Sequence, residues 1–284
     1  MEPSYESWEL AEGDEIVPGR LAVRRLGTGE RFETYLAWDE HLLSLVVVKV
    51  LRPHLVDDDH SLGRLVAEAE LLERLRHPVI VRGFDAALTG PRPHLVLEHL
   101  EGPRLSRLVR KQGRLEPDQL VPLALQLSSA LHYLGEEGVV HLDVKPSNVI
   151  MGAPARLIDL SIARTVAQLE GVTRSIGTAG YMAPEQREPQ RFGTPTPAAD
   201  VWGMGATLYR AAAGRPPFPD DRVLEEPEPL PSAVGAPMAA LIAACLDPDA
   251  AARPTPREAA AELEELAATM RRRLVMGRFR VRPR

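Results

Sequence analysis

The periodicity of the sequence changes near residue 104, and this change constrains the fold more than any other feature. Before it, residues 20–40 alternate around Gly27 and Gly29, which predicts two strands joined by a glycine turn. A β-branched run at 44–51 and the segment 94–100 predict two more strands, and 61–77 has helical spacing. After residue 104 the expected elements are helices, over 104–112, 117–137, 198–213, 237–246 and 256–273. The pattern predicts an α+β chain with a small strand-rich lobe and a larger, mostly helical lobe.

The composition is that of a soluble globular protein. The 284 residues are 44% hydrophobic and 26% charged, and the longest apolar runs are too short to span a bilayer. No signal-peptide pattern opens the chain, and Cys245 is the single cysteine, so an intrachain disulfide is excluded. These features predict a cytoplasmic location.

The charges behind the net charge of −6 are distributed unevenly along the chain. Residues 1–15 hold six acidic side chains and no basic one, whereas residues 271–284 hold seven arginines and no acid. Two readings stay open: a pair of solvated tails, or a basic tail that docks on an acidic partner, an anionic membrane surface or the chain's own N-terminus. We do not expect a nucleic-acid partner, because the tail has one aromatic residue and the body is acidic.

Two residue types are almost absent, and their positions are informative. Lysine occurs three times, at Lys49, Lys111 and Lys145, and asparagine once, at Asn148. Lys145 and Asn148 fall in the loop "HLDVKPSNVI" (141–150), and Lys49 ends the run "VVVK". Their persistence against this background suggests that arginine, glutamine or aspartate could not replace them.

The loop 141–150 and four further motifs carry a family resemblance. They are "LGTGERFET" (26–34), "GTAGYMAPEQ" (177–186), "ADVWGMGATLYRAAAGRPPF" (199–218) and "CLDPDAAARPT" (245–255). With these motifs, residues 18–268 resemble the bacterial members of the eukaryotic-like Ser/Thr protein kinase family. The resemblance implies a bilobal kinase fold with a five-stranded antiparallel N-lobe and one main helix there. The expected parts are an acidic extension (1–17), the N-lobe (18–97), a connector (98–103), the C-lobe (104–270) and an arginine-rich tail (271–284).

The resemblance also implies a reaction, the transfer of the γ-phosphate of ATP to Ser or Thr hydroxyls of proteins. Asp143 would orient the hydroxyl and accept its proton, and Lys145 would neutralise charge on the γ-phosphate. Asn148 and Asp159 would hold Mg²⁺, with Mn²⁺ as an alternative metal. Lys49, paired with Glu68, would contact the α- and β-phosphates. The implied nucleotide contacts are Leu26, Gly27, Gly29, Thr34, Val47, Lys49, Leu97, Glu98, Leu100 and Ile150.

Three more motif residues have implied supporting roles. Thr178 would hydrogen-bond Asp143 and Lys145, Asp200 would anchor the backbone of the catalytic loop, and Arg253 would pair with Glu185. An arginine can make such a pair bidentate and buried. This trio favours a protein kinase over a kinase of small molecules.

The chain departs from the family pattern at several positions, and four of them bear on phosphate binding or on control. Phe32 stands at the third glycine position, where it either clamps over the phosphates or impedes them. Leu142 replaces the arginine that pairs with a phosphorylated activation loop, so we expect little dependence on phosphorylation there. Leu160 and Ser161 replace Phe and Gly in the metal-binding triplet, which predicts a preset active conformation. Thr165, Thr173 and Ser175 remain candidate phosphorylation sites.

The segment after residue 218 carries five prolines within 219–237. Proline costs about 3 kcal/mol inside a helix, so we expect a helix between 219 and 232 to be short or absent. The sequence leaves two other functions open, a pseudokinase-like scaffold that binds nucleotide and a phosphotransferase acting on a small molecule or lipid. A monomer or weak homodimer is expected.

Overall fold

The computed structural model describes residues 6–218 and 227–277 of the chain. Contacts divide the chain into two compact units, which are described separately. Unit 1 comprises Met1–Arg76, Ile80–Glu101 and Asp159–Ser161, and unit 2 comprises His77–Val79, Gly102–Ile158 and Ile162–Arg284. The division at residue 101 falls within the predicted connector 98–103.

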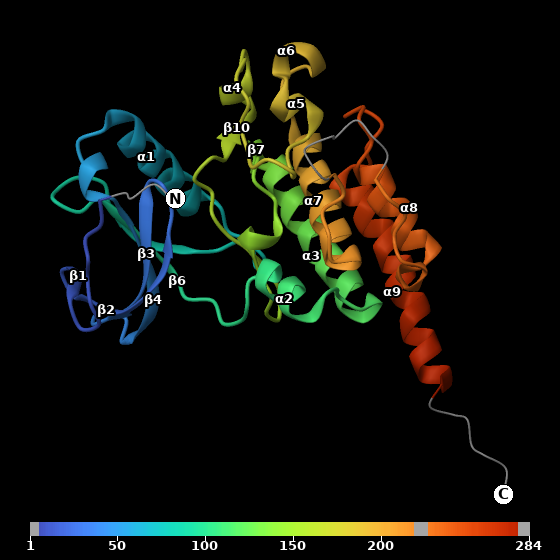
Figure 1. Ribbon diagram of the computed structural model, residues 1–284, viewed down its shortest axis with the longest axis horizontal. Helices are drawn as coiled ribbons and strands as arrows, with labels where there is room; N and C mark the ends of the chain where they lie inside the picture. The colour runs from blue at the N-terminus through green and yellow to red at the C-terminus, as the bar shows by residue number, and fades with distance from the viewer. Residues whose placement is uncertain (1–5, 219–226, 278–284) are drawn as a thin grey trace, which may run out of the picture. The chain divides into compact units, whose positions relative to one another are not determined.

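Unit 1 is built on one antiparallel sheet with the strand order β1-β2-β3-β4-β6-β5. The strands are β1 (Glu15–Val17), β2 (Arg20–Thr28), β3 (Phe32–Asp39), β4 (Ser44–Leu51), β5 (Gly83–Ala87) and β6 (His94–Glu98) (Figure 1). The predicted strands correspond to β2, β3, β4 and β6. The described sheet has six strands where five were expected, because β1 pairs with β2 at one edge.

Strand β4 shows why the sheet forms at this place. Val46, Val48 and Val50 are completely buried in one cluster with Tyr35 of β3, since β-branched side chains pack well on a pleated surface. The segment that we set apart as an acidic extension also belongs here. Trp8 and Leu10 pack against this cluster, so part of 1–17 is a layer of the sheet's core rather than a solvated tail.

Helix α1 (Asp59–Arg74) is the main helix of unit 1. The Asp58 side chain accepts the Ser61 N–H and caps its first turn. Its buried face carries Leu65, Leu71 and Leu72, which recur at helical spacing, and one carboxylate, Glu68. A short 3₁₀ turn, η1 (Pro53–Leu55), precedes it. The helix therefore brings a single charged side chain into an otherwise apolar face.

Unit 2 is mostly helical, as expected. Its helices are α2 (Leu105–Gln112), α3 (Pro117–Glu136), α4 (Val166–Leu169), α5 (Pro184–Arg187), α6 (Pro189–Phe192), α7 (Pro197–Ala213), α8 (Ala236–Cys245) and α9 (Pro256–Gly277). Short strands form two pairs, β7 (Val139–Val140) with β10 (Arg164–Thr165) and β8 (Val149–Ile150) with β9 (Arg156–Leu157). The 3₁₀ turns are η2 (Pro146–Asn148) and η4 (Ser232–Val234).

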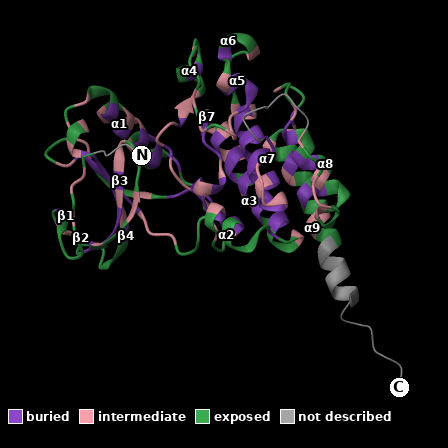
Figure 2. Cartoon of the chain, in the orientation of Figure 1, coloured by how far each residue is buried: buried purple, intermediate pink, exposed green. Residues whose placement is uncertain are grey.

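Helix α7 lies at the centre of unit 2 and is buried along most of its length (Figure 2). It contacts both α3 and α8, and α3 in turn contacts α9. At Gly203 the backbone approaches the catalytic loop so closely that a Cβ would lie 3.0 Å from the Val144 carbonyl oxygen. Glycine there lets α7 support the loop directly. No helix within the described residues is both long and apolar enough to cross a membrane.

Two sequence predictions fall partly outside the described residues. Of the segment 219–232, residues 219–226 lie outside them, and 227–231 are neither helix nor strand before η4 begins at Ser232. Of the predicted tail 271–284, residues 278–284 lie outside them, while 271–277 continue α9. The predicted boundary at residue 270 therefore falls inside a helix.

Candidate active site

The Lys49 side chain, on β4, lies between two carboxylates of unit 1. Its Nζ donates to both oxygens of Glu68, at 2.9 Å and 2.7 Å, and to Oδ1 of Asp159 at 2.9 Å. Lys49 is 7% exposed and Glu68 is 2% exposed. A buried ammonium of this kind needs counter-charges in contact with it. Unit 1 therefore contains the predicted Lys49–Glu68 contact and brings Asp159 to the same ammonium.

Burial and charge act in opposite directions on the pKa of Lys49. Burial alone would lower it, but the carboxylates of Asp159 and Glu68 outweigh burial and raise the pKa above the ordinary value for lysine. Burial raises the pKa of Glu68, against the effect of the Lys49 charge and of the Leu160 backbone N–H. Lys49 is thus a permanently positive group held in one position.

The glycine turn between β2 and β3 lies beside this cluster. Gly29 N–H donates to the Phe32 carbonyl at 3.0 Å, and β3 begins with Phe32. The Lys49 Nζ lies 4.7 Å from the centroid of the Phe32 ring, within the range of a cation–π interaction. The phenylalanine at the third glycine position therefore covers part of the Lys49 ammonium.

The other residues with implied nucleotide contacts in unit 1 lie along neighbouring strands. Thr34 is paired in register with both Gly27 and Lys49, and Val47 is paired with Leu97. The remaining positions in this unit are Leu26, on β2, Glu98, at the end of β6, and Leu100, just beyond it. In unit 2, Ile150 is a nearly buried residue of β8.

The catalytic loop of unit 2 forms a connected polar cluster around Asp143, which is 8% exposed. Asn148 Nδ2 donates to Oδ2 of Asp143 at 2.9 Å and to its backbone carbonyl at 3.0 Å. Lys145 Nζ lies 2.8 Å from Oδ2 of the same carboxylate. Thr178 donates to Oδ1 at 2.6 Å and accepts from Lys145 Nζ at 2.5 Å. All four predicted residues are thus in contact, and both oxygens of Asp143 are oriented by neighbours.

Asp200, from α7, holds the backbone at the start of this loop. Its carboxylate accepts the N–H of His141 at 2.6 Å and that of Leu142 at 2.7 Å. Leu142 has a φ of +66°, which a leucine adopts at a cost of about 1–2 kcal/mol. The two hydrogen bonds that the Asp200 carboxylate accepts hold this strained backbone in place. Burial raises the pKa of Asp200 to about 6, although the charge of His141 and the two backbone N–H groups oppose the rise.

The predicted pair between Arg253 and Glu185 is present and bidentate. Nη1 and Nη2 of the guanidinium lie 2.6 Å and 2.9 Å from the two carboxylate oxygens. The Arg253 Nε also donates to the Asp247 carbonyl, and Nη1 to that of Ala198. Because both charged side chains are buried, the pair connects α5 to the segment before α9 at a fixed distance.

Leu142 has an apolar environment where the family arginine would stand. With Val140 and Leu169 it forms a buried cluster, against which Ile162, Val172 and Ile176 are packed. Leu169 is the last residue of α4. Val172 and Ile176 lie on either side of the candidate phosphorylation sites Thr173 and Ser175. Residues 162–176, called the activation segment below, are therefore attached to the catalytic loop (141–150) by apolar side chains.

The three candidate phosphorylation sites differ in exposure. Thr173 and Ser175 are exposed, and the Ser175 hydroxyl donates to Sδ of Met182 at 3.4 Å. Thr165 is half-buried and caps α4 by accepting the N–H of Gln168. Modification of Thr165 would therefore disturb a helix cap, whereas the other two hydroxyls are accessible.

The sequence interpretation overlooked a residue that joins the loop to the activation segment. Gln186, on α5, donates through Nε2 to the Leu142 carbonyl at 2.8 Å and to the Ile176 carbonyl at 2.9 Å. Its backbone carbonyl accepts the Ile176 N–H. Its position next to Glu185 in "APEQ" was the available signal. A buried amide is needed there because two backbone carbonyls must be satisfied.

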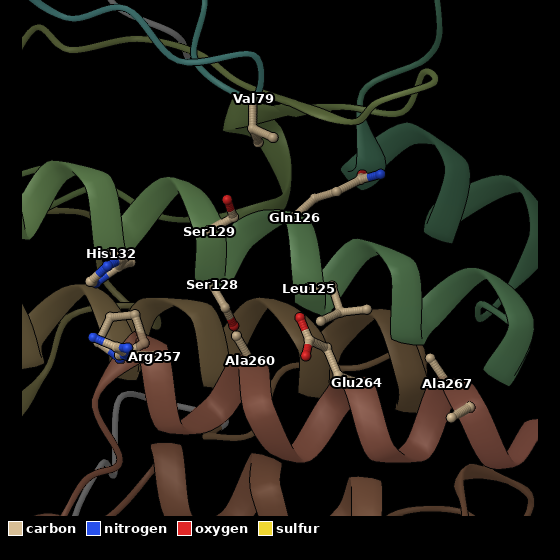
Figure 3. A pocket seen from close by; sticks show the side chains of 12 residues that line it. Val79, Leu125, Gln126, Ser128, Ser129, His132, Arg257, Ala260, Glu264 and Ala267 are labelled. Carbon is tan, nitrogen blue, oxygen red and sulfur yellow. The ribbon is translucent and has the colours of Figure 1, made fainter.

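A groove of about 900 Å³ in unit 2 lies apart from these residues. It is lined by α3 and α9, with His132 and Arg257 toward one end and Glu264 and Ala267 farther along (Figure 3). None of the predicted site residues lines it. The groove therefore has no part in the polar cluster around Asp143.

Comparison with known families assigns the chain. Residues 21–263, which include Lys49 and the loop 141–150, match the family model described as "Protein kinase domain". The chain belongs to this family. The family and the bilobal α+β fold that the sequence predicted are thus confirmed, with six described strands in the sheet of unit 1.

Curated relatives of the kinase domain come from several bacteria. "Serine/threonine-protein kinase PknB" of Mycobacterium leprae is 35% identical over 205 residues, 69% of this chain and 32% of that protein. "Serine/threonine-protein kinase PkaA" of Streptomyces coelicolor is 37% identical over 239 residues, 78% of this chain and 43% of that protein. "Serine/threonine-protein kinase pkn2" of Myxococcus xanthus is 33% identical over 220 residues. The chain spans about a third of the length of the PknB relatives.

Proposed function

We propose that this kinase domain transfers the γ-phosphate of ATP to serine or threonine hydroxyls of protein substrates. The observation that carries the proposal is the cluster of Asp143, Lys145, Asn148 and Thr178, in which both carboxylate oxygens of Asp143 have polar neighbours. Phosphoryl transfer needs alignment and charge neutralisation more than covalent participation of the protein. The names of the relatives, all serine/threonine-protein kinases, support the choice of hydroxyl.

Each side chain of the cluster has a role that its contacts allow. Asp143 is the group that orients the substrate hydroxyl and accepts its proton, since it is held in place by Asn148 and Thr178. Lys145, whose Nζ lies 2.8 Å from the Asp143 carboxylate, is the group that neutralises charge on the γ-phosphate. Thr178, from the segment preceding α5, hydrogen-bonds both Asp143 and Lys145 and so connects the two.

The residues assigned to nucleotide and metal carry the right donor types. Lys49 supplies a fixed positive charge for phosphate oxygens, and its position is set by Glu68. Asn148 and Asp159 offer an amide oxygen and a carboxylate, which suit a hard cation such as Mg²⁺. The Asn148 nitrogen donates to Asp143, so its amide oxygen is the atom left for a cation. Bound Mg²⁺ would neutralise charge on the phosphate oxygens.

A second candidate function is a scaffold that binds nucleotide without transferring phosphate. Phe32 favours it, because its ring covers the Lys49 ammonium that the phosphates would need. Against it, every residue assigned to the transfer step is present, and these residues include two of the chain's three lysines and its single asparagine. Transfer to a small molecule or lipid is less well supported, since Arg253 and Glu185 form the pair that the resemblance associates with protein kinases.

The test is a transfer assay with Mg²⁺ and [γ-³²P]ATP, using a generic basic protein as acceptor and phosphoamino-acid analysis of the product. We expect phosphoserine and phosphothreonine from the wild-type chain and a loss of at least about a thousandfold in Asp143→Asn and Lys49→Met. Glu116→Gln, at an exposed N-cap of α3, is the matched control and should retain full activity. Nucleotide binding without transfer would establish the scaffold instead.

We further propose that activity depends little on phosphorylation of the activation segment. The buried cluster of Leu142 and Leu169 supports this, because an apolar side chain stands where the family arginine would pair with a phosphate. The double variant Thr173→Ala/Ser175→Ala should keep more than about half of the wild-type rate. A loss of a hundredfold or more in that variant, with unchanged thermal stability, would contradict the proposal.

The setting of the enzyme is proposed on sequence grounds alone. The single cysteine favours a reducing compartment, for which we propose the cytoplasm. The arginines of 271–284 are proposed to dock on an acidic partner or an anionic membrane surface, and a monomer or weak homodimer is the proposed assembly. Sedimentation of the purified chain with and without anionic lipid vesicles tests the assembly state and the binding of the tail to a membrane surface.

A further inference from the structure

The guanidinium of Arg52, just after β4, joins three segments of unit 1. Nε donates to the Gly29 carbonyl at 2.8 Å, and Nη1 donates to the Glu6 carbonyl at 2.7 Å and to Oε1 of Glu33 at 3.1 Å. The Arg52 backbone N–H donates to the Arg31 carbonyl at 3.0 Å. Arg52 is only 3% exposed. One buried side chain thus contacts the N-terminal segment, the glycine turn and β3.

Glu33 makes this arrangement stable in the buried sheet. Its carboxylate, which is completely buried, is paired with Arg52 through Oε1 and accepts the hydroxyl of Tyr35 through Oε2. Burial and the Glu33 carboxylate raise the pKa of Tyr35, so the phenol keeps its proton and remains a donor. A buried pair whose partners are all satisfied holds its geometry more tightly than a surface pair.

The N-terminal segment is attached beside Arg52 by a second set of contacts. We call residues 6–17 the N-terminal strap. The indole N–H of Trp8 donates to the Leu51 carbonyl at 2.8 Å, and its ring lies 4.8 Å from the Arg92 guanidinium. Arg92 in turn donates to the carbonyls of Glu15 and Ile16, at 2.9 Å and 2.7 Å. The strap is therefore fixed at its start, through Glu6 and Trp8, and at its end.

The strap contacts the same end of β4 that supports the glycine turn. Leu51 is the register partner of Phe32, the first residue after the turn, and Arg52 holds the carbonyls of Gly29 and Arg31 within it. A turn containing glycine loses much conformational freedom when it is ordered, and neighbours that pre-organise it reduce this cost upon binding. The strap and the glycine turn are therefore linked through two consecutive residues, Leu51 and Arg52.

We propose that the N-terminal strap sets the nucleotide affinity of this domain, and that Arg52 is the positioning residue that transmits its effect to the glycine turn. This inference rests on the proposed function, in which the turn lies against the phosphates of ATP. Arg52 acts through backbone carbonyls and does not itself touch the nucleotide. Displacement of the strap would weaken nucleotide binding without changing the residues around Asp143.

The experiment compares Trp8→Ala, Trp8→Phe and Arg52→Lys in the full chain. Each lost hydrogen bond should weaken nucleotide binding by about twofold to tenfold. We expect Trp8→Ala and Arg52→Lys to raise both KM for ATP and the Kd of a fluorescent MgADP analogue by about three- to tenfold. Both kcat and KM for the protein acceptor should stay within twofold of wild type. Trp8→Phe keeps the ring, loses the donor, and should show a smaller rise.

Trp38→Ala is the matched control, because Trp38 lies on β3 of the same sheet and its side chain is exposed. An unchanged nucleotide affinity in Trp8→Ala and Arg52→Lys, with only the melting temperature lowered, would overturn the inference. An equal rise of KM in Trp38→Ala would also overturn it. A wild-type chain that neither binds MgADP nor transfers phosphate would instead reject the proposed function itself.

Discussion

At the scale of single residues, Phe32 has the most direct effect on the proposed chemistry. Its ring lies over an ammonium that Glu68 and Asp159 also contact, so the positive charge of Lys49 is shared among three neighbours. A phosphate can approach this charge only by competing with them. Phe32 is therefore expected to reduce nucleotide affinity rather than increase it.

The variant Phe32→Ala tests this expectation. A cation–π contact is worth about 0.5–2 kcal/mol, so its removal should lower the Kd of MgADP by about two- to thirtyfold. Fluorescence titration measures this, and Phe84→Ala, at the exposed phenylalanine of β5, is the matched control. A weaker affinity in Phe32→Ala would show that the ring clamps the nucleotide instead.

Asp200 provides a prediction on pH. Its pKa is raised by burial from 3.8 to about 6, so its contribution to stability is fully present below pH 3.8 and is lost as the pH rises through 6. The wild-type chain should therefore lose on the order of 3 kcal/mol relative to Asp200→Asn between pH 4 and pH 7. Urea unfolding of both proteins across this range measures the difference. A difference in unfolding free energy between the two proteins that does not change with pH would contradict the raised pKa of Asp200.

At the scale of elements, the activation segment is the part whose anchoring is unusual. Leu169, at the end of α4, packs on Leu142 of the catalytic loop, and Gln186 of α5 bonds both the loop and Ile176. Apolar packing of this kind does not require a modification, because it is present as soon as the chain folds. An ion pair between an arginine and a phosphate would be present only after the segment had been phosphorylated.

Leu169→Ala should loosen the segment. Removing a buried leucine side chain costs about 2–5 kcal/mol when the site cannot collapse, and part of this cost should appear as local opening. Trypsin cleavage after Arg174, which is exposed within the segment, should become about tenfold faster. Leu241→Ala, in the buried face of α8, is the control and should leave this cleavage rate unchanged.

At the scale of the whole molecule, the proposed roles are divided between the two units. Lys49, Glu68 and Asp159 belong to unit 1, and Asp143, Lys145 and Asn148 belong to unit 2. The contributions of Lys49 and of Asp143 can therefore be tested by substitutions in one unit or the other.

Thermal unfolding tests this division. MgADP at about a hundred times its Kd contributes about 2.7 kcal/mol, which should raise the Tm of the wild-type chain by about 5 °C or more. Lys49→Met should abolish most of this shift, whereas Asp143→Asn should retain it. Chelation of Mg²⁺ with EDTA should reduce the shift in both the wild type and Asp143→Asn. An unchanged Tm shift in Lys49→Met would show that Lys49 does not contribute to MgADP binding.

Much of the fold and of the site could be predicted because the signals are local. The β-branched run 44–51 became β4 over the same residues, and the leucine spacing of 61–77 became α1 within two or three residues at each end. Asp143, Lys145 and Asn148 lie within one short loop, so their proximity could be predicted from their spacing in the sequence. The edge strand β1 was missed because three residues carry no periodic signal.

By itself, the sequence determined the order of the elements, the family and the residue types available for phosphoryl transfer, because periodicity and motif spacing depend on neighbouring residues. Only the tertiary structure decided the distant contacts that no motif implied. Gln186 reaches Leu142 across 44 residues, and Trp8 reaches Leu51 across 43. Leu142, which in the sequence was only a missing arginine, is the centre of an apolar contact with the activation segment. Such contacts depend on how buried surfaces pack, and packing is a property of the folded chain.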